Sequence, residues 1–287
     1  MHILALAEQS NIMKRFLILL LLFLTVLSMC STRQVAAQEK DERLLPILMY
    51  HSVLESKQGT YYISPQALED DLSELKKRGY RSVTLHEVQC YLRGDGALPE
   101  KPVLITFDDG HYNNYYYAME ILKKQGFSAV LNVIGSFSEY SSTHEKDHPE
   151  YSHLTWDEIG ILARSGVFEI GNHSYNMHAY KPRFGITRKK SESEEEYEKA
   201  LREDTLRLEQ TLLQKSSVRP ISYAYPFGAY SKESERILRD LGYDTIFTCY
   251  EKVNRLIKGD SAKLSRLYRI NRDGTLGTKE FMDLHDL

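Results

Sequence analysis

Two segments of this 287-residue chain carry side chains of the types that bind metal ions. Asp108 and Asp109 follow the apolar run 102–105, within Thr106-Phe107-Asp108-Asp109-Gly110, and His173 and His178 lie further along the chain. Two imidazoles and one carboxylate leave coordination positions free for water and substrate, which is the pattern of catalytic zinc sites. The other carboxylate is then available as a base. These segments therefore predict metal-assisted hydrolysis.

Each segment alone has a simpler structural interpretation. Asp-Asp-Gly is common in turns, and a single histidine usually has a structural role. The combination favours a metal site, because each segment follows a stretch expected to form a buried strand. Neighbouring residues at a strand end point to different sides, so one of Asp108 and Asp109 can bind a cation while the other faces a substrate. Zinc is expected, although other divalent ions accept the same ligands.

Strands and helices are expected to alternate along the chain from about Leu45. Apolar runs predict strands at 46–49, 81–84, 103–107, 128–133, 167–170, 222–225 and 245–248. Helices are expected at 65–78, 115–125, 155–165, 193–214 and 231–241, and residues 135–153 are expected to form a long polar loop. Such alternation predicts a mostly parallel sheet covered by helices. About seven units without a glycine-rich nucleotide motif favour an α/β fold of the distorted (β/α) barrel type, with outer helices.

Barrels of this type place their chemistry at the C-terminal ends of the strands. Five candidate residues lie at or just past the end of an expected strand: His51, Asp108, Asp109, His173 and Tyr225. The elements therefore predict one shared site at that end of the barrel.

The N-terminus has the charge order of a secretory signal. Lys14 and Arg15 precede the apolar run 16–27, which is too short to span a bilayer comfortably, and Val35-Ala36-Ala37 is an acceptable cleavage site. We expect an upstream extension at 1–12, a signal peptide at 13–37 and a catalytic domain at 38–287. Lipidation at Cys30 and an uncleaved anchor are alternatives. Each version places the domain outside the cytoplasm and limits membrane contact to this segment.

The amino-acid composition indicates which kinds of binding partner to expect. A formal net charge of -3 gives no reason to expect nucleic acid as a partner. Tyrosine is abundant, with 20 residues against one tryptophan, and its flat apolar face with a polar tip suits contact with sugars.

Three segments together resemble the polysaccharide deacetylases, the NodB-homology family. Thr106–Gly110 resembles the first family motif, Gly171–His178 the second and Tyr225-Pro226-Phe227-Gly228 the third. The more usual second motif spaces its histidines by four residues. The spacing of five here is similar to the branch that deacetylates the poly-N-acetylglucosamine of biofilm matrix. The resemblance covers residues 44–280.

The resemblance implies roles for individual residues. Asp108 is implied as the general base, and the backbone N–H of Phe227 is implied to hold the oxyanion. The implied metal ligands are Asp109, His173 and His178. Leu48-Met49-Tyr50-His51-Ser52 resembles the first strand of the matrix branch, which implies that His51 is the acid.

Two family features are missing. Ala224 stands where many members have an arginine, and the late leucine-x-histidine segment is not recognisable. Arg269 is a candidate replacement for the arginine, and we include it among the substrate-binding residues together with Tyr225, Phe227 and Trp156.

We therefore expect a metal-dependent hydrolase, with Zn²⁺ as cofactor, that removes N-acetyl groups from an N-acetylglucosamine-containing polysaccharide. Matrix poly-N-acetylglucosamine is the favoured substrate, and peptidoglycan or chitin oligomers are the alternatives. A non-catalytic sugar-binding protein of the same fold is a further alternative, but pure binding does not need the spare carboxylate. A metal-dependent phosphatase is disfavoured because no phosphate-binding motif is present.

Overall fold

The computed structural model describes residues 41–144 and 147–287 together with Met13. The expected upstream extension and signal peptide therefore lie outside the described residues, apart from Met13. Among the residues that are described, no helix has the length and apolar character needed to cross a membrane.

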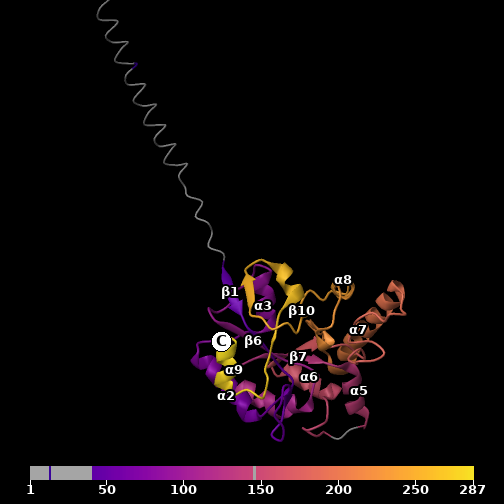
Figure 1. The fold of residues 1–287 in the computed structure, drawn as a ribbon, viewed down its shortest axis with the longest axis horizontal. Helices are drawn as coiled ribbons and strands as arrows, with labels where there is room; N and C mark the ends of the chain where they lie inside the picture. The colour runs from indigo at the N-terminus through magenta and orange to yellow at the C-terminus, as the bar shows by residue number, and fades with distance from the viewer. Residues whose placement is uncertain (1–12, 14–40, 145–146) are drawn as a thin grey trace, which may run out of the picture. The chain divides into compact units, whose positions relative to one another are not determined.

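The centre of the domain from Glu42 to Leu287 is one parallel sheet (Figure 1). Its strands run in the order β10 (Ile246–Phe247), β9 (Tyr223–Ala224), β8 (Phe168–Asn172), β7 (Ala129–Val133), β6 (Pro102–Phe107), β2 (Ile47–Tyr50) and β12 (Ile270–Asn271), and β5 (Arg81–Ser82) also pairs with β6. Every residue of β6 and β7 is buried. Continuous apolar strands of this kind are typical of parallel sheets covered on both faces.

A short segment closes this sheet. Leu267 pairs with Phe247 of β10, and β12 pairs in parallel with β2. The segment 267–271 therefore connects one end of the strand order to the other, as expected for the distorted (β/α) barrel. It also carries Arg269 into the interior, where its side chain is fully buried.

The expected helices surround the strands. They are α2 (Pro65–Lys77), α4 (Met119–Gln125), α6 (Trp156–Arg164), α7 (Glu194–Ser216) and α8 (Lys232–Asp240). Ser64 caps α2 by accepting a hydrogen bond from the N–H of Ala67, as its position before Pro65 predicts. Ser193 and Glu196 form a reciprocal capping box at the start of α7.

Several elements were not expected from the sequence. Residues 135–153 are not a continuous loop, because they contain α5 (Gly135–His144), and the helix at 115–125 begins as a π-helical turn, η1 (Asn114–Ala118). The remaining additional elements are β1 (Glu42–Leu45), β3 (Ser52–Val53), β4 (Tyr62–Ile63), α3 (Leu85–Leu92), the 3-10 turns η2 (Pro226–Gly228) and η3 (Ser261–Arg266), β11 (Asn254–Ile257), α9 (Thr278–Leu284) and the strand β12 described above.

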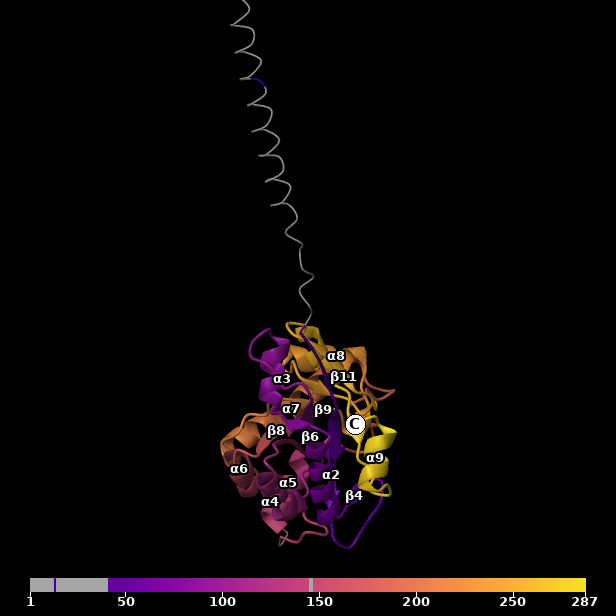
Figure 2. The same ribbon diagram turned by 90° about the vertical axis from the view of Figure 1, so that its left-hand side faces the viewer.

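The C-terminal helix α9 packs beside α2, although the two are far apart in sequence (Figure 2). A buried ion pair supports this contact. The guanidinium of Arg272 donates to both carboxylate oxygens of Asp71 at 2.7 and 3.0 Å, and the Thr278 hydroxyl donates to the same carboxylate at 2.6 Å. These bonds fix the chain that follows β12.

Candidate active site

A cavity of about 700 Å³ opens at the C-terminal ends of the strands. Asp108 and Asp109 follow β6, His173 follows β8, and His51 follows β2. The residues that line the cavity include all four of these together with His178, His111, Tyr61, Tyr180, Phe184, Tyr225 and Phe227. The structure therefore brings together the two motif segments at the predicted end of the barrel.

Left-handed backbone at Asp109 separates the two neighbouring carboxylates. Asp109 has φ 71° and Gly110 has φ 69°. Aspartate tolerates this conformation better than most residues, and glycine adopts it without steric cost. The turn directs Asp108 towards Arg269 and Asp109 towards the histidines.

Three ligand atoms converge on one point. Asp109 Oδ1 lies 3.6 Å from His173 Nε2 and 3.4 Å from His178 Nε2. One ligand atom from each of the three residues lies within 4.8 Å of the others. Asp109 Oδ1 is buried and has no hydrogen-bond partner.

These distances suit a metal ion better than a hydrogen-bonded cluster. Good N–H···O bonds are about 2.7–3.2 Å long, so the three atoms face one another without bonding well. Ligands held about 2.1 Å from a tetrahedral zinc ion lie about 3.4 Å from each other. The donor set of two imidazoles and one carboxylate also suits zinc and leaves a position free. The residues therefore fit a divalent cation.

Backbone contacts set the orientation of His173. Its Nδ1 lies 2.9 Å from the carbonyl oxygen of Ala224. A carbonyl only accepts hydrogen bonds, so Nδ1 carries the proton and the lone pair of Nε2 points to the cluster. Ala224, which occupies the position of the missing arginine, thus contributes through its main chain.

The loop that carries His178 is held by an acidic side chain of α7. Asp204 accepts hydrogen bonds from the N–H groups of Tyr175 and Asn176, each at 2.8 Å. The Ser174 hydroxyl accepts from the Met177 N–H at 3.1 Å. Burial raises the pKa of Asp204 against the opposing effect of these N–H groups. The carboxylate fixes the backbone immediately before His178.

Asp108 is held by two partners inside the barrel. Arg269 donates to both of its oxygens, at 2.7 and 2.8 Å, and Asn132 Nδ2 donates to Oδ1 at 2.7 Å. Burial alone raises the pKa of Asp108, but the charges of Arg269 and His173 outweigh this effect and hold the pKa below its usual range. Asp108 is therefore ionised at neutral pH.

The structure places the expected acid, His51, in the same cavity. Its carbonyl accepts a hydrogen bond from Asn114 Nδ2 at 2.9 Å, which fixes the backbone at the end of β2. Its Nδ1 is buried without a partner. Burial lowers the pKa of His51, while the charges of Asp109 and Asp108 act in the opposite direction.

Three of the expected sugar contacts need correction. Trp156 is only 4% exposed, packs in the core and donates its indole N–H to Glu139 at 2.7 Å, so it does not face the cavity. Tyr225 borders the cavity, but its side chain is fully buried and its ring stacks on Tyr230. Arg269 contacts Asp108 rather than open space, so it takes the place of the missing arginine and is not a substrate-binding residue.

Sequence reasoning missed several residues at the site. His111 Nε2 lies 3.6 Å from Asp109 Oδ2, whereas the other two histidines face Oδ1. It directly follows Gly110 in the first motif, and no feature distinguishes it from a structural histidine. Asn132 gave a clearer signal, because it is an amide within the apolar strand 129–133. Tyr180 and Phe184 line the cavity from the loop after His178.

Residues 95–246, more than half of the chain, match the family described as polysaccharide deacetylase. The chain belongs to the polysaccharide deacetylase family. It is 27% identical over 223 residues to the poly-beta-1,6-N-acetyl-D-glucosamine N-deacetylase of Escherichia coli K12, and this match covers 70% of the chain and 33% of that protein. The chain therefore spans about a third of the length of this relative.

Solved structures of deacetylases share the fold. The structure of IcaB from Ammonifex degensii matches with a TM-score of 0.67 and 30% identity, covering 79% of this chain and 91% of that one. A de-N-acetylase from Aggregatibacter actinomycetemcomitans matches with a TM-score of 0.71 and 24% identity, covering 84% of this chain and 99% of that one.

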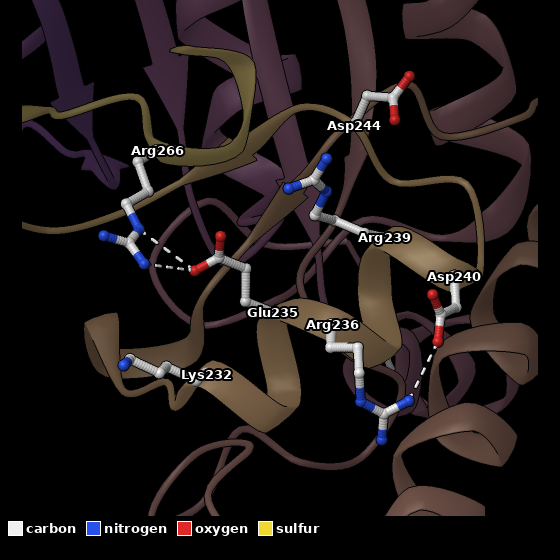
Figure 3. A pocket seen from close by; sticks show the side chains of 7 residues that line it. All are labelled: Lys232, Glu235, Arg236, Arg239, Asp240, Asp244 and Arg266. Atoms are coloured by element: carbon white, nitrogen blue, oxygen red, sulfur yellow. Dashed lines mark hydrogen bonds and ion pairs between the residues drawn. The ribbon is translucent and has the colours of Figure 1, made fainter. Parts of the chain in front are cut away.

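A second cavity, of about 530 Å³, lies over α8 and differs in character from the first (Figure 3). It is lined by charged side chains of both signs. Arg266 binds Glu235 at 2.8 Å, and Arg236 binds Asp240 at 3.1 Å. Two of its four cationic side chains are paired in this way, and three carboxylates line the same surface, so it does not form a concentrated site for an anion.

Proposed function

We propose that this chain is a metal-dependent hydrolase that removes N-acetyl groups from an N-acetylglucosamine-containing polysaccharide. The observation that carries the proposal is the position of the Asp108 carboxylate, 3.9 Å from His173 Nε2, beside the converging atoms of Asp109, His173 and His178. A binding protein needs the cavity but not a base held by a buried arginine and an amide.

The proposed metal is zinc, held by Asp109 Oδ1 and by the Nε2 atoms of His173 and His178. A bound divalent cation polarises the acetamide carbonyl and lowers the pKa of water. The fixed tautomer of His173 and the clamped loop before His178 keep both lone pairs directed to this position.

The proton transfers are assigned to residues of the chain. Asp108 takes a proton from the water that attacks the acetamide carbon. His51 gives a proton to the departing amine when the carbon–nitrogen bond breaks, so that acetate and a free amino sugar are released. The backbone N–H of Phe227 is proposed to bind the oxyanion of the tetrahedral intermediate.

Matrix poly-N-acetylglucosamine is the proposed substrate. The support is the five-residue histidine spacing, the similarity to the E. coli poly-beta-1,6-N-acetyl-D-glucosamine N-deacetylase and the structural similarity to IcaB. Such a polymer lies outside the cell, and we propose an extracytoplasmic location from the signal-like N-terminal sequence.

Two matched variants test the proposal. Asp108→Asn is expected to bind zinc like the wild type and to lose acetate release from poly-N-acetylglucosamine, whereas Asp109→Ala is expected to lose both. Metal content and acetate are measured on the same samples, with peptidoglycan and chitin oligomers as parallel substrates. Near-normal acetate release by Asp108→Asn would rule out this base.

A further inference from the structure

Three aromatic side chains form a continuous surface at the mouth of the cavity, which we call the aromatic wall: Tyr180, Phe184 and Phe227. The rings of Tyr180 and Phe227 lie 4.5 Å apart at 24°, and those of Phe184 and Phe227 lie 5.2 Å apart at 12°. Tyr180 is 72% exposed and Phe184 is 45% exposed. Exposed aromatic rings that adjoin one another at the edge of a cavity are candidates for a ligand-binding surface.

The aromatic wall begins at the candidate metal ligands. The ring of Phe227 lies 4.2 Å from the ring of His178, and all three wall residues line the same cavity as Asp108. The surface therefore leads from the reacting position outward to solvent. A ligand bound on it lies next to the group that reacts.

The backbone holds the aromatic wall in place. Gly185 has φ 55°, and a β-carbon there would lie 2.7 Å from the carbonyl oxygen of Pro226, so this glycine lets the two segments approach closely. Phe227 itself has φ 57°, an uncommon conformation for a phenylalanine. The N–H of Gly185 donates to the carbonyl of Ala179 at 3.0 Å and closes the loop that presents Tyr180.

We propose that the aromatic wall binds the sugar ring next to the one whose acetyl group is removed. This inference rests on the proposed function and assigns Tyr180 and Phe184 as specificity-determining residues. The C–H face of a pyranose is flat and apolar, so it packs on exposed aromatic rings, while its hydroxyl groups remain in water. The wall therefore favours a polymer over a single sugar.

The test compares Tyr180→Ala, Phe184→Ala and the double variant with the wild type on an N-acetylglucosamine hexamer. We expect the KM of the double variant to rise about tenfold, with a much smaller change in kcat. Tyr180→Phe keeps the aromatic ring, so this variant is expected to retain most of the affinity of the wild type for the hexamer. Tyr116→Ala is the matched control, because Tyr116 is 54% exposed but does not line the cavity.

Calorimetric titration of the hexamer into the same proteins measures affinity independently of turnover. The proposal is supported if the double variant binds the hexamer more weakly than the wild type, while Tyr180→Phe and Tyr116→Ala bind it as the wild type does. Equal affinity in the double variant and the wild type overturns it, whatever the acetate assay shows. Absence of acetate release by the wild type, with hexamer binding that depends on the wall, refutes the proposed function and with it the assignment of the wall to the ring beside a reacting sugar, and supports only a sugar-binding surface.

Discussion

Removal of Arg269 tests how Asp108 is kept ionised inside the barrel. The Arg269→Met variant retains a long apolar side chain but removes both hydrogen bonds, at 2.7 and 2.8 Å, to the carboxylate. The side chains are 0% and 3% exposed, so water replaces the lost contacts poorly. Leaving one charge of a buried pair uncompensated costs roughly 3–5 kcal/mol of unfolding free energy.

A double-mutant cycle separates this electrostatic loss from lost packing. Urea unfolding at pH 7, with a chelator present throughout, is measured for the wild type, Arg269→Met, Asp108→Asn and the double variant. The double variant contains no stranded charge, so we expect it to be about 2 kcal/mol more stable than Arg269→Met alone. If the losses of the two single variants simply add, Arg269 does not compensate the charge of Asp108.

The free energy of unfolding of the wild type and of Arg269→Met should depend on pH in a defined direction. The folded pKa of Asp108 lies below its unfolded value, so the pair contributes stability above about pH 4, and this contribution disappears as the pH falls through the folded pKa. The gap in unfolding free energy between wild type and Arg269→Met should therefore narrow as the pH is lowered.

Arg272→Met is the matched control. Arg272 forms a similar buried pair with Asp71, with side chains 1% and 0% exposed, on the same stretch of chain but away from Asp108. Both variants should lose stability, and only Arg269→Met should also impair the base. Equal kcat losses in the two variants, assayed below the unfolding transition, would contradict a specific role for Arg269.

Three further variants test other parts of the site. Asp204→Asn keeps only one acceptor for the N–H groups of Tyr175 and Asn176, so the loop before His178 is held less firmly. Zinc affinity, measured by competition with a chelator dye, should therefore fall about tenfold. Unchanged affinity would contradict the role of Asp204 in holding this loop. In Gly171→Ala the new β-carbon would collide with Asn132 Oδ1, and thermal or urea unfolding should show a loss of about 1–3 kcal/mol; wild-type stability would contradict this packing. Trp156→Phe removes the hydrogen bond to Glu139 and part of a buried ring, so stability should fall by about 1–3 kcal/mol while KM is unchanged; a raised KM would return Trp156 to the substrate site.

The main barrel was predictable because its strands are short apolar runs separated by capped helices. The buried strand 102–107 and the cap at Ser64 show this clearly. The strand in the closing segment, β12, was missed because it is only two residues long and has an arginine on each side. The sequence around it shows no alternation of apolar and polar residues that would predict a strand. The helix α5 was missed because its sequence is polar and has no apolar face.

The candidate site was predictable where local sequence determines position. Asp108, Asp109 and His173 sit at strand ends, and parallel strands bring these ends together. Arg269 reaches Asp108 only through closure of the barrel, which its neighbours in sequence do not reveal. Trp156 was misassigned because an aromatic residue type does not show which side of a helix faces the core. Tyr180 and Phe184 depend on loop packing against η2.

The central claim is that one cation, held by Asp109, His173 and His178, supports amide hydrolysis with Asp108 as base. The most direct measurement is acetate release from poly-N-acetylglucosamine by chelator-treated protein, before and after stoichiometric Zn²⁺ is added. The account predicts no release before the addition and recovery after it. Full release by the metal-free protein, or none after zinc is bound, would contradict the account.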